Sequence, residues 1–435
     1  MTLGCLYMDI DNMRVVFFAV DPSADVIAAH AVRGLHERLK DVEITGVGGS
    51  CMMNAGMKPL KSEKMSVIAN KICYNHVRTR AISCIISAIM NVRKLARYLA
   101  QNPPDILVTA DAYYYSIIIA KYLKKHCPKV VLVHMISPSV WVYYRKRADI
   151  CKRVYDHMIV LYPFELPYFQ NAENMTAVCC GCPLLDYTPP DEEATLKKRQ
   201  EILSGGDADR KILLILSGSR KGVLQSVLSI QKEVIERVAK HNNIKVVNVA
   251  LPETYEEVVN TVKTWDIDVH VECIPIGDEH INNRLLIYST ADVAYMSVGA
   301  SALDMMYADV PMVVYVYRSN SIFEQLVIWL CKKTLKSLQD ITPSLVGCIS
   351  SRKDATPFFM TSQLANAYDD MACTLSNIIS KNEEGLECIA TQKLAFEECK
   401  KRLGEVSASH GNIPFAQRVT NSIIEASNRK TGWVD

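Results

Sequence analysis

Residues 14–20 read RVVFFAV and residues 21–25 read DPSAD. The first stretch is an unbroken apolar run with β-branched and aromatic residues, which is typical of a strand buried on both faces of a parallel sheet. Ser23 and Asp25 in the second stretch favour the start of a helix, and apolar side chains follow them at helical spacing. The opening of the chain therefore predicts a strand that leads directly into a helix.

The same alternation of strand and helix continues along the chain. Further short apolar runs lie at residues 42–47, 106–109, 130–135 and 157–161 and, after a polar, proline-bearing stretch at 187–193, at residues 211–216, 244–249, 269–274, 292–296 and 311–316. Helical patterns separate these runs, and the chain beyond residue 321 is mainly helical in pattern. The series predicts two doubly wound α/β domains facing a cleft, at 14–187 and 188–340, followed by a helical segment at 341–435.

The composition limits the class of protein. The chain has 435 residues, too many for one core, with 49% hydrophobic and 22% charged side chains and a formal net charge of +2. Because nucleic-acid-binding proteins are usually far more basic, we expect no nucleic-acid partner. The 15 cysteines are odd in number and scattered, which indicates free thiols in a reducing cytosol rather than a disulfide framework.

No metal site or cofactor site is expected. The tightest cysteine group, Cys179, Cys180 and Cys182, lacks the second pair of ligands that a structural zinc site requires. Two Asp-Ile-Asp triplets, at 9–11 and 266–268, lie away from the expected cleft and are interpreted as solvated turns.

Two apolar segments raise the question of a membrane surface. The N-terminal residues lack the pattern of a signal peptide, and no apolar run reaches the ~20 residues that a membrane span needs. Shorter apolar stretches at 81–90 and 322–331 are bordered by cations, as in segments that lie on an anionic membrane. The alternative, which the pattern alone favours, is an ordinary buried helix with basic side chains at its ends.

Two loops of the second domain have the composition of an anion-binding site. Residues 217–222 read SGSRKG and follow a predicted strand, and residues 296–304, MSVGASALD, make the same transition. Glycine lets a phosphate approach the backbone, a helix N-terminus favours anions, and Arg220 adds a fork of donors. The alternatives are an ordinary turn with a solvated arginine for the first loop and close packing of a helix on a strand for the second.

The first domain offers a carboxylate and an aromatic, basic loop. Asp111 follows a predicted strand at the edge where a cleft is expected, and could act as a general base on a sugar hydroxyl. The alternative is a helix cap. Residues 137–147 read SPSVWVYYRKR, a mixture that suits a sugar or a phosphorylated lipid headgroup, with a basic surface loop as the alternative.

Taken in order, several segments resemble the lipid-A-disaccharide synthase family from about residue 14 to the final helices. The most specific is SPSVW at 137–141 with Lys146 and Arg147. The others are PFE at 163–165, Gly181 with Pro183, Leu184 and Asp186, GSR at 218–220, Gly299 with Leu303, PMVV at 311–314, and Tyr317 with Arg318. The resemblance implies a GT-B fold, in which two Rossmann-like domains face a cleft, with C-terminal helices.

The resemblance also implies an activity. It is the transfer of a 2,3-diacylglucosamine unit from UDP to 2,3-diacylglucosamine 1-phosphate, an inverting and metal-independent step of lipid A (lipopolysaccharide) biosynthesis. The products are a β-1,6-linked disaccharide 1-phosphate and UDP. The first domain would hold the acceptor lipid and the second the UDP-sugar.

Individual residues acquire expected roles from this resemblance. Asp111 matches the catalytic carboxylate, which would take the proton of the acceptor 6-hydroxyl. We expect UDP to contact Gly218, Ser219, Arg220, Gly299, Ala300, Ser301 and Asp304. We expect the acceptor and its headgroup to contact Ser23, Asp25, Ser137, Ser139, Trp141, Lys146 and Arg147.

The resemblance bears on location and assembly as well. Segment 66–97 matches the membrane-facing region of the family, which favours the membrane-surface interpretation of 81–90. We therefore expect a cytoplasmic protein attached peripherally to the cytoplasmic face of the inner membrane. Family members form homodimers, so the segment 341–435 either packs back on its own chain or is exchanged between two copies.

Several positions differ from the family pattern. Val20 and Ala24 replace two glycines of the first loop, and Ser217 stands where a proline is usual. The residues after Asp111 are Ala-Tyr-Tyr-Tyr-Ser in place of Ala-Pro-Asp-Phe-Asn. These differences keep two alternatives open: a GT-B transferase with a changed acceptor, and a GT-B-fold protein that binds a lipid or a partner without catalysis.

Overall fold

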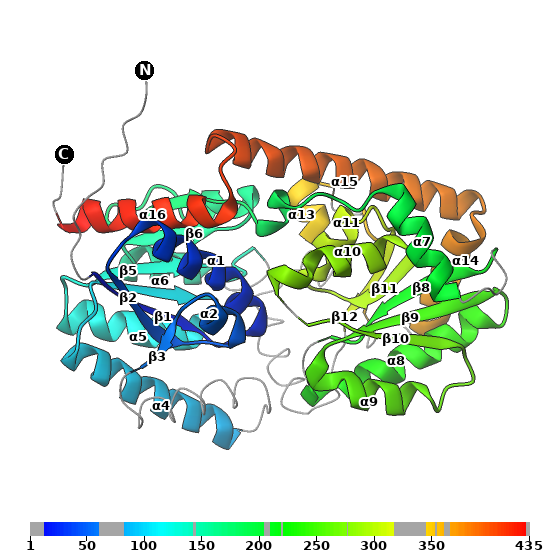
Figure 1. Ribbon diagram of the computed structural model, residues 1–435, viewed down its shortest axis with the longest axis horizontal. Coiled ribbons are helices and arrows are strands. Elements are labelled where there is room, and N and C mark those ends of the chain that lie inside the picture. Colours follow the sequence, from blue (N-terminus) through cyan, green and yellow to red (C-terminus); the bar gives the residue numbers. More distant parts are fainter. Residues whose placement is uncertain are drawn as a thin grey trace. The chain divides into compact units, whose positions relative to one another are not determined.

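The structure is a computed structural model with two compact units. It describes residues 13–60, 82–141, 145–203, 209–218, 221–275, 277–316, 345–352, 355–360 and 366–431. One unit comprises Met1–Pro183 and Val406–Asp435, and the other comprises Leu184–Glu405. Each unit has one parallel sheet with helices on both faces (Figure 1), so the predicted doubly wound α/β class is confirmed.

The first unit has a seven-stranded sheet in the order β3-β2-β1-β4-β5-β6-β7. Its strands are β1 (Met13–Ala19), β2 (Val42–Val47), β3 (Lys58–Pro59), β4 (Ile106–Ala110), β5 (Val131–Met135), β6 (His157–Val160) and β7 (Thr176–Cys179). Its helices are α1 (Pro22–Arg38), α2 (Ser50–Asn54), α4 (Ile82–Gln101), α5 (Tyr113–His126), α6 (Lys146–Val154) and α16 (Phe415–Thr431), with the 3-10 turn η1 (Pro163–Tyr168).

The opening apolar run supplies both faces of this sheet. Val15 and Phe17 of β1 lie in the core shared with α1 and α16, whereas Val16 and Phe18 lie in the core shared with α4, α5 and α6. All four side chains are buried, because successive side chains of a strand point to opposite faces and helices cover both. The run is therefore continuously apolar instead of alternating.

The last helix, α16, belongs to the first unit and lies beside α1 (Figure 1). The core on this face of the sheet receives from α16 the side chains of Phe415, Val419, Ile423 and Ala426. Polar contacts add to it: His157 Nε2 lies 2.6 Å from Ser422 Oγ, and Lys430 Nζ donates to Asp156 Oδ2 at 2.6 Å. Residues far apart in the sequence thus complete one unit.

A glycine allows α1 and α16 to approach closely. A Cβ atom at Gly34 would lie 2.3 Å from Thr420 Oγ1 and 2.8 Å from the carbonyl oxygen of Ala416. Any side chain at this position would force the two helices apart, because packed elements leave no room for an added carbon.

The second unit has a six-stranded sheet in the order β10-β9-β8-β11-β12-β13. Its strands are β8 (Lys211–Leu216), β9 (Ile244–Ala250), β10 (Val269–Cys273), β11 (Val293–Ser297), β12 (Met312–Val316) and β13 (Phe358–Met360). Its helices are α7 (Glu192–Leu203), α8 (Lys221–Ala239), α9 (Pro252–Val262), α10 (Ile281–Ser289), α11 (Ser301–Tyr307), α13 (Leu345–Ser350), α14 (Ala367–Ser380) and α15 (Glu383–Ser409), whose last residues belong to the first unit. The 3-10 turns are η2 (Pro183–Asp186), at the unit boundary, and η3 (Asp278–His280).

The prediction that residues 341–435 are helical missed one strand, β13. β13 pairs in parallel with β12, joining Val314 to Phe358 and Val316 to Met360. It extends the sheet by three residues, too few for a periodic pattern to reveal.

None of the helices in the described ranges is long and apolar enough to cross a membrane. The described cysteines are free thiols. Burial raises the pKa of Cys179 and Cys180 to about 12, so these two thiols stay protonated at neutral pH. The described ranges also contain no group of three His, Cys, Asp or Glu side chains arranged to hold a metal ion.

Candidate functional site

In the first unit the candidate residues follow the carboxyl ends of adjacent strands. The register pairs Ala19 of β1 with Ala110 of β4, and Ala110 with Met135 of β5. The segments that begin with Asp111 and Ile136 therefore leave the sheet at the same edge. The winding of the sheet reverses between β1 and β4, and ligands of doubly wound sheets bind outside the strand ends at such a switch point.

The backbone at this edge is strained. Asp111, Ala112 and Ile136 have φ values of 49°, 43° and 62°. A left-handed conformation costs about 1–2 kcal/mol for a residue with a side chain, although aspartate tolerates it better than alanine or isoleucine. Strain of this kind persists where the surroundings enforce it, and it concentrates at functional sites.

The backbone of Asp111 is held on both sides. Its N–H donates to the carbonyl of Met135 at 3.0 Å, and Ser116 Oγ donates to its carbonyl at 2.7 Å. The helix that follows, α5, begins at Tyr113, and its cap residue is Ala112, without a side-chain bond. The cap position of α5 is thus occupied by Ala112 and not by Asp111, whose half-buried side chain stands at the end of β4.

Beneath this edge, β4 and β5 are joined by a buried polar contact. His134 Nδ1 lies 2.7 Å from Thr109 Oγ1, and the imidazole stacks on Tyr155 with ring centroids 4.8 Å apart. Burial lowers the pKa of His134 to about 3, so the ring is neutral at physiological pH.

The expected acceptor residues Ser23 and Asp25 have different surroundings. Ser23 is exposed and its hydroxyl donates to Asp21 Oδ1 at 2.8 Å. Asp25 is 5% exposed and accepts hydrogen bonds from the backbone N–H groups of Gly49 (2.7 Å) and Cys51 (2.9 Å). Burial raises its pKa, against the opposing effect of these bonds. The carboxylate thus ties α1 to the loop that opens α2.

Ser137 is hydrogen-bonded to a buried glutamate, Glu165. Its hydroxyl donates to Glu165 Oε1 at 2.6 Å, and the N–H groups of Leu161 and Tyr162 donate to Oε2 at 3.3 and 3.2 Å. Burial raises the pKa of Glu165 to about 7, although hydrogen bonds from Ser137, the two backbone groups and Trp141 oppose the rise. Glu165 was not among the expected site residues, even though the PFE segment that contains it carried part of the resemblance.

An aromatic cluster surrounds this glutamate. The rings of Trp141 and Phe164 meet edge to face at 5.4 Å, and Phe164 stacks on Tyr162 at 5.9 Å. Ser139, in the same loop, is half-buried. The loop after β5 is therefore fixed from below by Glu165 and from the side by aromatic packing.

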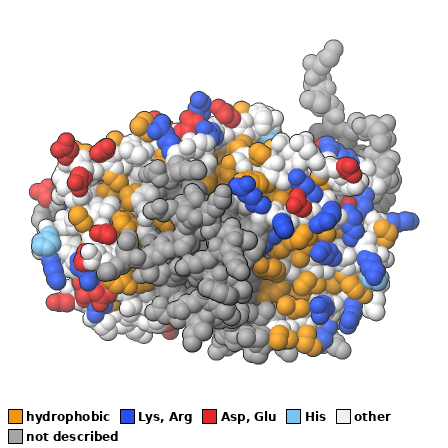
Figure 2. All heavy atoms as spheres, turned by 180° about the vertical axis from the view of Figure 1, so that it is seen from behind, with side chains coloured by type: hydrophobic (Ala, Val, Ile, Leu, Met, Phe, Trp, Pro, Cys, Tyr) orange, Lys and Arg blue, Asp and Glu red, His pale blue; other side chains and the backbone are white. Residues whose placement is uncertain are grey.

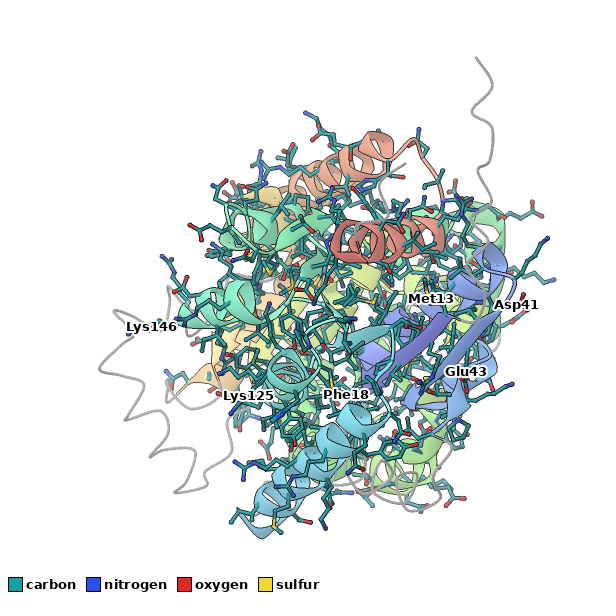
Figure 3. The ribbon with its side chains drawn as sticks, turned by 90° about the vertical axis from the view of Figure 1, so that its left-hand side faces the viewer. Met13, Phe18, Asp41, Glu43, Lys125 and Lys146 are labelled. Carbon is teal, nitrogen blue, oxygen red and sulfur yellow. The ribbon has the colours of Figure 1, made fainter. Side chains whose placement is uncertain are left out.

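The basic end of this loop contacts the residues that follow Asp111. The Arg147 guanidinium lies 5.0 Å from the ring centre of Tyr113 and 4.8 Å from that of Tyr114, and it donates to the Tyr114 hydroxyl at 2.5 Å. Lys146 is exposed at the edge of the unit, as Figure 3 shows. Arg147 is thus placed beside the strand end that carries Asp111.

In the second unit two loops leave adjacent strands. The register pairs Leu216 of β8 with Met296 of β11, where the winding of this sheet reverses. Gly218 has a φ of +82°, and a Cβ at Gly218 or Gly299 would meet no described atom within 4 Å. Both glycines are exposed, so a ligand can approach their backbone. Ser219 and Arg220 lie outside the described residues.

The remaining expected contacts of UDP lie around the start of α11. Ala300 is exposed and Ser301 is the first residue of the helix. Asp304 Oδ2 lies 3.5 Å from Nε of Arg284, and both side chains are 17% exposed. Burial raises the pKa of Asp304, and Arg284 opposes the rise. Arg284 is a cation at this loop that sequence reasoning missed, because it precedes Asp304 by twenty residues on another helix.

Comparison with known proteins adds to this geometry. A family model described as lipid-A-disaccharide synthetase matches residues 15–346. The chain is 29% identical over 314 residues to the lipid-A-disaccharide synthase of Rickettsia akari, which covers 71% of this chain and 74% of that protein. It is 26% identical over 422 residues to the synthase of Ruegeria pomeroyi, which covers 95% of each chain.

Solved structures share the fold at low sequence identity. The N-terminal domain of Candida albicans trehalose-6-phosphate phosphatase has a TM-score of 0.53 at 9% identity and covers 97% of both chains. Spinosyn rhamnosyltransferase complexed with thymidine diphosphate has a TM-score of 0.50 at 10% identity and covers 92% of this chain and 100% of its own. At these identities the likeness establishes the fold alone.

Proposed function

Because the chain belongs to the lipid-A-disaccharide synthetase family, we propose how its residues carry out the glycosyl transfer of lipid A disaccharide synthesis. The protein is a glycosyltransferase that uses a UDP-sugar. The donor is UDP-2,3-diacylglucosamine and the acceptor is 2,3-diacylglucosamine 1-phosphate. The products are the β-1,6-linked disaccharide 1-phosphate and UDP.

Asp111 is the general base of this reaction. The acceptor 6-hydroxyl oxygen attacks the anomeric carbon of the donor, a new C–O bond forms, and the bond from that carbon to the UDP oxygen breaks with inversion. The hydroxyl proton passes to the Asp111 carboxylate. The observation that carries this assignment is the strained backbone, which holds a half-buried carboxylate at the switch point of the first sheet.

The second unit holds the leaving group. Gly218 and Gly299 leave backbone open to a diphosphate at the ends of β8 and β11, and α11 begins directly after the second loop. The proposed UDP contacts also include Ser219, Arg220, Ala300, Ser301 and Asp304. Binding UDP more tightly as negative charge develops on it would speed the departure step.

The acceptor lies against the loop after β5. Arg147, stacked on two tyrosines next to Asp111, places a positive charge where it would attract the acceptor phosphate. Lys146 adds positive charge, and Ser23, Ser139 and Trp141 line the same proposed side. Asp25 and Ser137 support this acceptor side from below. The Asp25 carboxylate accepts from the backbone N–H of Gly49, and the Ser137 hydroxyl donates to Glu165.

A membrane surface lies next to this acceptor side. The exposed face of α4 combines Ile86 and Met90, which are 54% and 53% exposed, with the exposed cations Arg93, Lys94 and Arg97. Figure 2 shows hydrophobic and basic side chains together over the first unit. Apolar side chains bordered by cations suit an anionic bilayer, here the cytoplasmic face of the inner membrane. Residues 66–81 and 322–331 of the expected membrane segments lie outside the described residues.

The decisive experiment compares the chain with its Asp111→Asn variant. Purified protein in detergent receives both lipid substrates, and disaccharide is followed by mass. Asparagine also tolerates a left-handed backbone, so the variant should fold, whereas losing the base should slow turnover by about 10²–10⁴-fold. Unchanged turnover in a folded variant would refute the assignment of Asp111.

One observation favours a second candidate, a transferase with a changed acceptor. Tyr114, which stands where the family pattern has an aspartate, takes the hydrogen bond from Arg147. If the wild-type chain binds UDP and yet forms no disaccharide with several acyl lengths, the changed acceptor replaces the first proposal. A folded chain that does not bind UDP would point to a binding protein without catalysis.

The membrane assignment has its own test. Ile86→Glu and Met90→Glu should release the protein from vesicles that contain anionic lipid, in a flotation assay. Leu386→Glu on α15 is the matched control, because that side chain is 52% exposed on the other unit. Equal release by all three variants would contradict a role for α4.

A further inference from the structure

Beneath the start of the Gly218 loop lies a chain of buried polar side chains. Ser217, Gln231 and Asn248 are 2%, 0% and 0% exposed. Asn248 Nδ2 donates to Ser217 Oγ at 2.8 Å, Ser217 Oγ lies 3.3 Å from Gln231 Oε1, and Gln231 Nε2 donates to the carbonyl of Leu216 at 3.0 Å. Ser217 Oγ also lies 3.1 Å from Asn248 Oδ1, so the contacts join the three side chains into one network that includes the carbonyl of Leu216.

The network connects three elements at one point. Ser217 is the residue between β8 and Gly218, Asn248 lies on the neighbouring strand β9, and Gln231 lies on α8, the helix after the loop. The strand, its neighbour and the helix are thereby fixed to each other at the position where the chain turns into a positive φ at Gly218.

Apolar side chains would be the ordinary occupants of these positions. Asn248 stands between buried valines, and Gln231 is surrounded along α8 by the buried side chains of Leu228, Val234 and Ile235. A buried amide is tolerated only when its polar atoms find partners, since an unsatisfied one costs about 1–3 kcal/mol. A fully bonded set gives rigidity and a defined geometry instead.

We propose that Gln231 and Asn248 are positioning residues for the diphosphate of the UDP-sugar, acting through Ser217 on Gly218. This inference rests on the proposed function, in which Gly218 contributes to the UDP site. The family pattern has a proline at position 217, whose ring would restrict φ by covalent geometry. In this chain the same position is restricted by hydrogen bonds of the Ser217 hydroxyl with two amide side chains.

The test measures UDP affinity by calorimetry on the full chain. Gln231→Met removes the bonds to Ser217 and Leu216 at nearly constant volume, and we expect UDP to bind about tenfold more weakly. Ser217→Ala, which deletes one oxygen and keeps both amides, should weaken UDP binding in the same direction. The Ser217→Ala variant provides the test if Gln231→Met does not fold.

A second buried glutamine supplies the matched control. Gln392 is 0% exposed in the same unit and its Oε1 accepts a hydrogen bond from the N–H of Met312 at 2.9 Å, on β12. Gln392→Met should lower the melting temperature as Gln231→Met does, and yet leave UDP affinity unchanged. Equal weakening of UDP binding by both variants would overturn the proposal.

A proline at position 217 separates positioning from general destabilisation. In a Ser217→Pro background the loop no longer depends on the amides, so adding Gln231→Met should change UDP affinity less than twofold. A tenfold loss in that background would contradict the proposal. Absence of UDP binding by the unmodified chain is a different result, which would overturn the proposed function and this inference together.

Discussion

In the first unit the chain leaves β4 and β5 through Asp111, Ala112 and Ile136, which carry side chains at positive φ, whereas in the second it leaves β8 through Gly218. The proposed proton transfer needs a carboxylate at the strand end, and the positive φ values there cost about 1–2 kcal/mol per residue. A diphosphate requires accessible backbone, which glycine supplies without strain. The contrast supports the proposal that proton transfer belongs to the first unit and diphosphate binding to the second.

The supports beneath the two edges differ as well. A serine lies at the centre of each: Ser137 donates to the ionisable Glu165, whereas Ser217 contacts the amides of Asn248 and Gln231. Only the first support contains a group that titrates near neutral pH. The predictions that follow test this difference, beginning with the largest expected effect.

The stability of the first unit should depend on the protonation of Glu165. Its pKa in the folded state is about 7, above its ordinary value of 4.5, so the folded state favours the protonated form. Stability is therefore fully present below pH 4.5 and declines as pH rises through 7. Relative to a Glu165→Gln variant, we expect the free energy of unfolding to fall by about 3 kcal/mol, measured by urea unfolding from pH 4.5 to 8.

The control for this series is the exposed Glu37, whose Glu37→Gln variant should follow the wild-type pH curve. Parallel curves for wild type and Glu165→Gln would show that Glu165 does not titrate in this range.

Gly218→Ala should weaken UDP binding by about tenfold, since a side chain at a φ of +82° costs about 1–2 kcal/mol and distorts the loop. Gly299→Ala is the comparison, because Gly299 has equal space around it without a positive φ. Calorimetry with UDP measures both. If Gly299→Ala weakened UDP binding more than Gly218→Ala does, the strain at position 218 would not be the main effect, contrary to this prediction.

The smallest effect is a gain in stability. Ala112→Gly removes left-handed strain of about 1–2 kcal/mol and adds unfolded-state entropy of about 0.5–1 kcal/mol, so we expect the folded state to gain up to about 1 kcal/mol. Thermal unfolding would detect this gain, and Ala110→Gly, within β4, should instead destabilise. A loss of stability with Ala112→Gly would mean that its φ is not a source of strain.

Much of the fold could be predicted from local pattern. The run at 14–20 becomes β1 because a strand covered on both faces must be apolar throughout, and the same reasoning locates β8 at 211–216. Asp111 could be identified as a candidate because it follows such a run. The proposed roles of the site residues remain predictions for the experiments above.

Features that depend on distant contacts could not be predicted. Neither Ala112 nor Ile136 is a residue type that favours positive φ, so their conformation could not be predicted from the sequence. An asparagine at 248 in an apolar run gives no sign of a partner at 217. Likewise, the apolar pattern of α16 does not indicate which of the two sheets the helix covers.

The position of α16 has a consequence for synthesis of the protein on the ribosome. One face of the first sheet is completed by Phe415, Val419 and Ile423, which emerge only after the whole second unit. Domains usually fold in the order in which they leave the ribosome, yet this unit must wait with an apolar surface uncovered while the later one can already fold. Nascent first units would therefore be clients of holding chaperones, and a premature stop codon before residue 415 would damage the part of the protein that was made first.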